Sequence, residues 1–141
     1  MKRDKNFKIS VSCEINGKSI PYPVYYPDPH DNECVSAGDT FYHITYKGNT
    51  KTFLVPTGLR YDGASIPRPL WVTIGQPFNP DFIRAAFIHD KWYKELIKTV
   101  SRAYADEVFY HILLADGVTR FRAYKMYLAV STFGRFCWDQ K

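Results

Sequence analysis

The first part of the chain alternates hydrophobic and polar residues, as a half-buried β-strand does. Apolar side chains recur at every second position of the first expected strand: Phe7, Ile9, Val11, Cys13 and Ile15. Asn16-Gly17 follows, and this dipeptide is typical of a tight hairpin turn because both residues tolerate positive φ. We expect the return strand to reach Tyr26, at a sheet edge, because Pro21 and Pro23 have no N–H to donate.

A second hairpin is predicted after a polar segment. Residues Pro27–Asp39 are rich in loop-forming types, so we expect an irregular segment there. Alternation returns over Phe41–Tyr46 and Thr52–Val55, with Lys47-Gly48-Asn49 between them. The N-terminal part of the chain therefore predicts an antiparallel sheet made of two hairpins.

The middle of the chain has a composition that resists regular structure. Between Pro56 and Pro80 the chain holds five of its nine prolines and three glycines. A long loop inside a compact protein usually has a function. We therefore expect an ordered, functional loop over residues 56–79.

Three helices are predicted after this loop. Asn79-Pro80-Asp81 is a helix start, and that helix is expected to run to about Lys98. Ser101 caps a second helix over Arg102–Ala115, which Asp116-Gly117 ends. The third helix is apolar nearly all round, as a core or interface helix is.

Length and composition favour one folded unit. A chain of 141 residues is long enough to bury a core, and 45% hydrophobic and 17% aromatic residues argue against disorder. We therefore expect a single α+β domain over residues 1–141, mainly β over 1–55, an ordered loop over 56–79 and helical over 80–137.

Charge and cysteine content narrow the partners. A net charge of +5 favours an anionic partner such as a lipid headgroup or a phosphate. The basic residues are scattered, so we expect no nucleic-acid binding. Three cysteines without CxxC spacing argue against a disulfide framework and a zinc site, and indicate a reducing compartment.

The strongest candidate for chemistry lies on the first two helices. His89, Asp90 and Tyr93 share one broad face of a helix. If the next helix packs antiparallel, Asp106 accepts a hydrogen bond from one imidazole nitrogen and leaves the other as a general base. From the rise of about 1.5 Å per residue, we expect the His89 and Asp106 side chains to meet only if the two helices splay or the first helix ends early.

Asp90 is a candidate ligand for calcium, which prefers oxygen ligands. The loop Tyr61–Pro69 would supply carbonyl oxygens, and its Asp62, Gly63 and Ser65 are candidates for contacting the substrate. Such a cation would polarise a substrate carbonyl and stabilise the oxyanion that forms when water attacks. An Asx-turn and a loop cap explain the polar loop residues equally well.

Three alternatives use the same residues differently. A buried polar network, hydrogen-bonded throughout, would tie the loop to two helices without catalysis. A second enzyme would use Ser65 as the nucleophile of a triad with His89 and Asp106. A third, a metal-dependent phosphohydrolase, would use His89 and Asp90, with His111 as the other histidine expected on a helix.

From Val55 onward the chain resembles a family of uncharacterised proteins common in phages and prophages. The shared pattern is a proline, a D-x-A-S-x-P loop, a tryptophan, an A-A-x-x-H-D-x-x-Y helix and an S-R-x-x-A-D segment. These are Pro56, Asp62–Pro67, Trp71, Ala85–Tyr93 and Ser101–Asp106. The resemblance implies action in the host cytoplasm or the virion. We expect no signal peptide or transmembrane segment, since no apolar window is long enough.

The helical core is similar to secreted and parvoviral phospholipases of the A2 type, on its H-D-x-x-Y helix and the aspartate of the next helix. The resemblance implies that His89 activates water, Asp90 binds calcium, Asp106 orients the histidine and Tyr93 supports the network. We therefore expect a hydrolase of carboxylic esters, with a phospholipid as candidate substrate and an anionic membrane surface as candidate partner. The alternative is a phage structural or host-interaction module that binds another phage or host protein.

Overall fold

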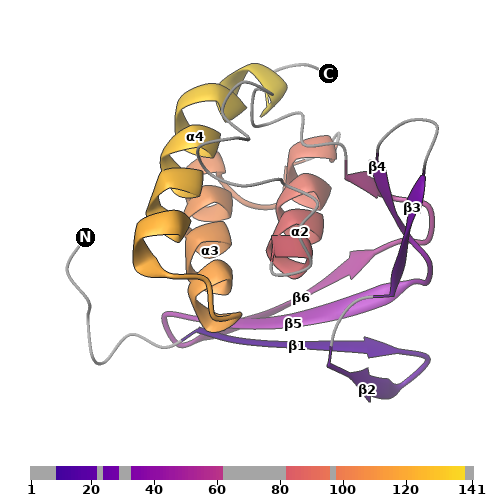
Figure 1. The fold of residues 1–141 in the computed structure, drawn as a ribbon. Coiled ribbons are helices and arrows are strands. Elements are labelled where there is room, and N and C mark those ends of the chain that lie inside the picture. The colour runs from indigo at the N-terminus through magenta and orange to yellow at the C-terminus, as the bar shows by residue number, and fades with distance from the viewer. Residues whose placement is uncertain (1–8, 22–23, 29–32, 62–81, 96–97, 139–141) are drawn as a thin grey trace.

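The computed structural model describes residues 9–21, 24–28, 33–61, 82–95 and 98–138. Along these described residues, antiparallel strands come first and three helices follow. Figure 1 shows the helices side by side over one face of the larger sheet, with a smaller sheet beside them. The predicted α+β class is confirmed.

The larger sheet contains both predicted hairpins. Its strand order is β2-β1-β5-β6, with every neighbouring pair antiparallel. The strands are β1 (Ile9–Ile15), β2 (Lys18–Ile20), β5 (Thr40–Tyr46) and β6 (Asn49–Val55). Asn16-Gly17 and Lys47-Gly48 form the two turns, with φ of 53° and 77° in the first and 52° and 77° in the second. Positive φ at both central residues is what a twisted two-residue hairpin needs.

A second, smaller sheet differs from the prediction. The return strand β2 stops at Ile20, and β3 (Tyr25–Asp28) pairs with β4 (Glu33–Ser36), which pairs with β7 (Arg60–Tyr61). An irregular segment was predicted over Pro27–Asp39, and this prediction was wrong for Pro27, Asp28 and Glu33–Ser36, which lie in strands. The last three residues of β4 are buried, and that burial outweighs the turn preference of the residues around them.

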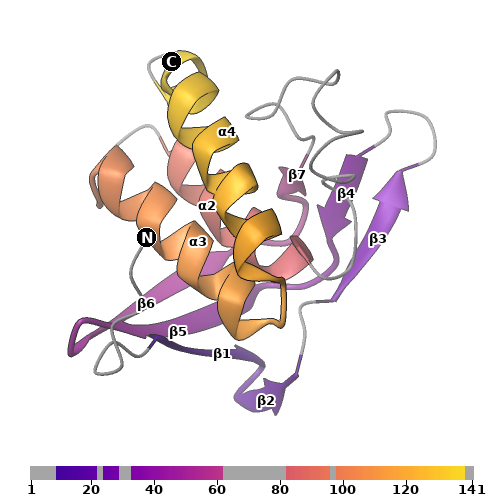
Figure 2. The ribbon, with the colours of Figure 1, turned by 60° about the vertical axis from the view of Figure 1, so that its left-hand side comes forward.

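In the part of the chain that the structure describes, the helices are α2 (Ile83–Lys94), α3 (Arg102–Ala115) and α4 (Arg120–Trp138). The bounds of α3 are those predicted, because the Ser101 hydroxyl accepts a hydrogen bond from the Tyr104 N–H (3.1 Å). The first helix is shorter than predicted, since it ends at Lys94. Figure 2 shows the three helices running alternately in opposite directions.

The core lies between the larger sheet and the helices. Alternate side chains of β5 and β6 point toward the helices and are buried: Tyr42, Ile44, Tyr46, Phe53 and Val55. Phe53 meets the ring of Trp92 edge-on, with centroids 4.8 Å apart. Removing these apolar surfaces from water holds α2 and α3 on the sheet.

A largely buried ion pair ties the two layers together at the start of α2. Arg84 pairs with Asp116 at the end of α3, and its Nη1 also donates to the carbonyl of Val11 in β1 (3.2 Å). The two charged side chains are 13% and 8% exposed. A single arginine therefore links α2, α3 and β1.

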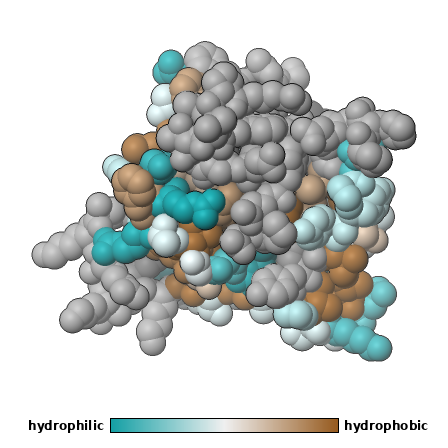
Figure 3. Space-filling view, in the orientation of Figure 1, coloured by the Kyte–Doolittle hydropathy of each residue, from teal (hydrophilic) through white to brown (hydrophobic). Residues whose placement is uncertain are grey.

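The third helix contributes to the core and also presents apolar residues to solvent. Ala123, Met126 and Val130 are buried, whereas Phe121 and Leu128 are exposed. Figure 3 shows hydrophobic residues at the surface in separate patches on the face it displays. Within the described ranges, no helix combines the length and the apolar character that crossing a bilayer requires.

Candidate functional site

Asp106 is the centre of a buried hydrogen-bond network between α2 and α3. Its Oδ1 accepts a hydrogen bond from the Tyr93 hydroxyl (2.7 Å) and lies 2.8 Å from Nε2 of His89. His89 and Asp106 are each 2% exposed, and Tyr93 is 4% exposed. Because a carboxylate can only accept, Nε2 carries the hydrogen, and the neutral ring keeps its lone pair on Nδ1.

The early end of α2 is what brings His89 level with Asp106. His89 lies five residues before Lys94, and Asp106 lies five residues after the capping residue Ser101. Both side chains are therefore about 7.5 Å from the end at which the antiparallel helices are joined. A helix continued to Lys98 would place His89 about 13.5 Å from its end and out of level with Asp106.

Lys98 explains why α2 can end where it does. Its Nζ donates to the carbonyls of Trp92 (3.1 Å) and Tyr93 (2.7 Å), which lie in the last turn of a helix that stops at Lys94. A cation at the C-terminal end of a helix also interacts favourably with the helix dipole. The residue expected to be the last of the helix is thus its cap.

Aromatic rings enclose the imidazole. The His89 ring lies 4.2 Å from the ring of Tyr93 and 4.7 Å from the ring of Phe109, measured between centroids. Tyr93 in turn meets Trp138 of α4 edge-on at 4.9 Å. The orientation of His89 is therefore set by packing as well as by Asp106.

Burial and the Asp106 carboxylate both raise the pKa of the Tyr93 hydroxyl above its ordinary value. Burial is the larger cause, because it disfavours the charged phenolate. Tyr93 therefore stays protonated throughout the physiological range and remains a hydrogen-bond donor to Asp106.

Arg102 also belongs to this network, although it was not among the predicted site residues. Its Nη1 lies 3.5 Å from Oδ2 of Asp106 and donates to the carbonyl of Ser131 in α4 (3.0 Å). Its side chain is 32% exposed. Arg102 and Asp106 are four residues apart on one helix, and this spacing is the sequence signal from which their contact could have been predicted. Arg102 balances the charge of Asp106 and connects the network to α4.

Asp90 lies beside this network and is 3% exposed. Its Oδ2 is 3.4 Å from Nζ of Lys94, one helical turn later. Lys94 also donates to the carbonyl of Arg60 in β7. The side of α2 that carries Asp90 is therefore next to the strand that leads into residue 62.

The described residues do not by themselves fit a calcium ion. Calcium takes roughly six to eight oxygen ligands, whereas the Asp90 carboxylate is paired with the ammonium group of Lys94. Within the described ranges there is no group of three or more His, Cys, Asp or Glu residues that could hold a metal. The predicted loop residues Asp62, Gly63 and Ser65 lie outside the described residues. A calcium site therefore stays a prediction.

Two curated relatives from Sinorhizobium fredii (strain NBRC 101917 / NGR234) align with about half of the chain. The uncharacterised protein y4jT is 41% identical over 80 residues, which cover 57% of this chain and 23% of the relative. The uncharacterised protein y4iH is 38% identical over 73 residues, which cover 52% of this chain and 30% of the relative. The chain thus spans less than a third of either relative. No solved structure matches it.

A family model also matches the chain, over residues 40–130. The matched region begins with β5 and extends into α4, so it includes His89, Asp90, Tyr93, Arg102 and Asp106. The match covers more than half of the chain. The chain therefore belongs to the family described as a protein of unknown function (DUF1353).

Proposed function

We propose that this protein hydrolyses carboxylic esters, with the acyl ester of a phospholipid as substrate. The observation that carries the proposal is the contact of 2.8 Å between Asp106 Oδ1 and His89 Nε2. This contact orients the ring and makes Nδ1 the nitrogen that can accept a proton. The resemblance of the H-D-x-x-Y helix and the later aspartate to phospholipases of the A2 type supports the same roles.

In the proposed reaction Nδ1 of His89 takes a proton from a water molecule while the water oxygen attacks the ester carbonyl. The tetrahedral intermediate then breaks its bond to the alcohol oxygen, which receives the proton from the imidazolium. The products are a carboxylic acid and an alcohol. Asp106 stabilises the imidazolium formed in between, and Tyr93 and Arg102 hold Asp106 in place.

The setting of this activity follows from charge and resemblance. A net charge of +5 supports action at an anionic membrane surface. The resemblance to phage and prophage proteins supports a place in the infected bacterium or in the virion. If calcium takes part, Asp90 and oxygen atoms of the loop would bind it. The comparison of calcium with chelator tests this role separately.

A second candidate function is a non-catalytic phage structural or host-interaction module. The observation that favours it is burial, since His89 and Asp106 are each only 2% exposed. A hydrogen-bonded and solvent-excluded set of polar side chains also specifies how helices pack. In that case the same residues would act on stability alone.

Release of fatty acid from mixed phosphatidylcholine and phosphatidylglycerol vesicles separates the two candidates. Wild type, His89→Ala and Asp106→Asn are compared with calcium and with chelator, and His43→Ala on β5 is the matched control. His43 is a partly exposed strand histidine that bonds Thr52 (2.9 Å). We expect release by wild type and by His43→Ala, with a loss of about 10²-fold or more in the two site variants.

Each result has a defined meaning. No release by a stably folded wild-type protein would favour the module. Release that persists in chelator would remove calcium from the mechanism. Covalent labelling of Ser65 by a fluorophosphonate would replace the water mechanism with the triad alternative.

A further inference from the structure

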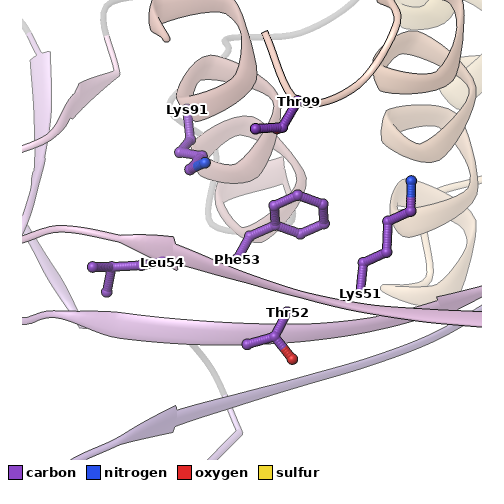
Figure 4. A pocket seen from close by; sticks show the side chains of 6 residues that line it. All are labelled: Lys51, Thr52, Phe53, Leu54, Lys91 and Thr99. Atoms are coloured by element: carbon purple, nitrogen blue, oxygen red, sulfur yellow. The ribbon is translucent and has the colours of Figure 1, made fainter. Parts of the chain in front are cut away.

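A surface hollow of about 460 Å³ lies between β6 and the helical side, and its lining includes none of His89, Tyr93 and Asp106. It is lined by Lys51, Thr52, Phe53, Leu54, Lys91 and Thr99. Figure 4 shows Lys51 and Phe53 rising from the strand, with Lys91 and Thr99 opposite them on the helical side. The hollow therefore has one wall made by a β-strand and another made by α2 and the residues after it.

The strand in this wall is an edge strand. Within the described ranges, β6 pairs with β5 alone. Tyr46 and Asn49 flank the two-residue turn, so they form a hydrogen-bonded backbone pair. Along an antiparallel ladder such hydrogen-bonded pairs recur at every second residue. By this alternation Lys51 and Phe53 direct their backbone groups toward β5, whereas Thr52 and Leu54 direct theirs outward. That outer edge can accept a further strand.

The side chains above this edge combine an apolar floor with two ammonium groups. Phe53 is 8% exposed and packs on Trp92. Nζ of Lys51 lies 4.5 Å from the ring centroid of Tyr104. Nζ of Lys91 lies 2.5 Å from Oε2 of Glu95 and 5.4 Å from the ring centroid of Phe53. Among the described residues, these two ammonium groups face one carboxylate, that of Glu95, so this part of the hollow is positive.

We propose that this hollow binds an extended acidic segment of a partner protein, which adds to β6 as a further strand. The backbone of the segment pairs with Thr52 and Leu54, and its alternate side chains lie over Phe53 between Lys51 and Lys91. Main-chain hydrogen bonds supply affinity, and the two lysines select acidic side chains.

The charges also argue against a second copy of this chain as the occupant. Pairing β6 with the β6 of another copy brings together two strands that each carry Lys51, with Lys91 above each of them. Like charges in close juxtaposition disfavour such a pair. Lysine on an edge strand is one way in which proteins prevent self-association. An acidic strand meets no such repulsion.

The test uses a fluorescein-labelled eight-residue peptide of alternating glutamate and valine, with binding measured by fluorescence anisotropy. We expect Lys51→Glu with Lys91→Glu to weaken binding at least about tenfold. The double variant Lys18→Glu with Lys47→Glu is the control for the same change of net charge, because Lys18 lies in β2 and Lys47 in the β5–β6 turn, both outside the hollow. Its Kd should stay within about twofold of wild type, since an exposed distant charge is screened.

Backbone pairing is tested separately. Leu54→Pro removes one outward N–H and leaves the ladder with β5 intact, as proline on a strand edge does. We expect it to weaken binding, and a peptide methylated on alternate backbone nitrogens to bind more weakly than its parent. Amide resonances of Thr52 and Leu54 should shift when the parent peptide is added.

The proposal is overturned if the acidic peptide does not bind, or if a peptide of alternating lysine and valine binds equally well. It is also overturned if the shifted amides lie on α4 rather than β6. None of these readouts depends on ester hydrolysis, so the outcome is independent of the proposed function.

Discussion

Gly134 of α4 leaves the space that the Tyr93 hydroxyl of α2 occupies. A Cβ at position 134 would lie 2.6 Å from that oxygen and 3.1 Å from Cζ of the ring. The same hydroxyl donates to Asp106 at 2.7 Å. The absence of a side chain on the third helix therefore allows Tyr93 to reach the carboxylate that orients His89.

We expect Gly134→Ala to lower the free energy of unfolding by about 1–3 kcal/mol, because the methyl group displaces a packed ring. Helix propensity alone predicts the opposite sign, since alanine is the better helix former by about 0.8–1.0 kcal/mol. Urea unfolding measures the difference. Thr132→Ala, at an exposed position of the same helix, is the control and should raise stability by at most about 0.7 kcal/mol, through helix propensity alone. If Gly134→Ala were more stable than wild type, the Tyr93 ring would have to move aside without lowering the free energy of unfolding.

Arg102→Gln should lower stability by about 1 kcal/mol, since it removes a charged donor to the Ser131 carbonyl and the cation nearest Oδ2 of Asp106. Under the proposed function it should also slow ester hydrolysis, with Arg102→Lys in between. Chemical denaturation and the vesicle assay give the two numbers. Lys18→Gln removes one positive charge from an exposed position of β2 and should change neither. Equal values for Arg102→Gln and Lys18→Gln would remove Arg102 from the network.

Two arginines offer a comparison between a buried and an exposed ion pair. Arg84→Met removes the cation that pairs with Asp116, whose side chain is 8% exposed, and should cost about 3 kcal/mol or more. Arg60→Met, which breaks the pair with Asp28 where the arginine is 43% exposed, should cost less than about 1 kcal/mol. Denaturant unfolding of the two variants measures both losses of stability. Similar losses would contradict the assignment of Arg84 as the link between layers.

His111 should make stability fall in mild acid. Burial lowers its pKa below the ordinary value of 6.5, and Glu107 opposes this effect. The unfolded chain therefore binds the proton more readily than the folded one. The stability that neutral His111 contributes to the folded state is fully present above pH 6.5. It is lost as the pH falls through the lowered pKa of His111 in the folded protein.

We expect His111→Phe, which keeps a ring against Tyr46 and Tyr110, to flatten the dependence of the unfolding free energy on pH between 7.5 and 5. His43→Phe, at a partly exposed position, is the matched control. Identical slopes for wild type and His111→Phe would assign the acid sensitivity to another group.

Much of this fold could be predicted because the rules that decide it are local. Alternation and the Asn16-Gly17 and Lys47-Gly48 turns specify the two hairpins, since register and turn geometry depend on neighbouring residues. Ser101 and Gly117 set the limits of α3 for the same reason, as caps act within one turn. The pairing of β4 with β3 and β7 could not be predicted, because it depends on burial by distant parts of the chain.

The candidate site divides in the same way. The sequence by itself determined that His89 and Tyr93 share a face of α2 and that Asp106 faces inward on α3, because helical periodicity requires it. Only the tertiary structure decided that His89 of α2 lies against Asp106 of α3, that Arg102 reaches Ser131 of α4, and that Gly134 admits Tyr93. These are contacts between separate elements, and their geometry follows from how the helices pack rather than from residue spacing.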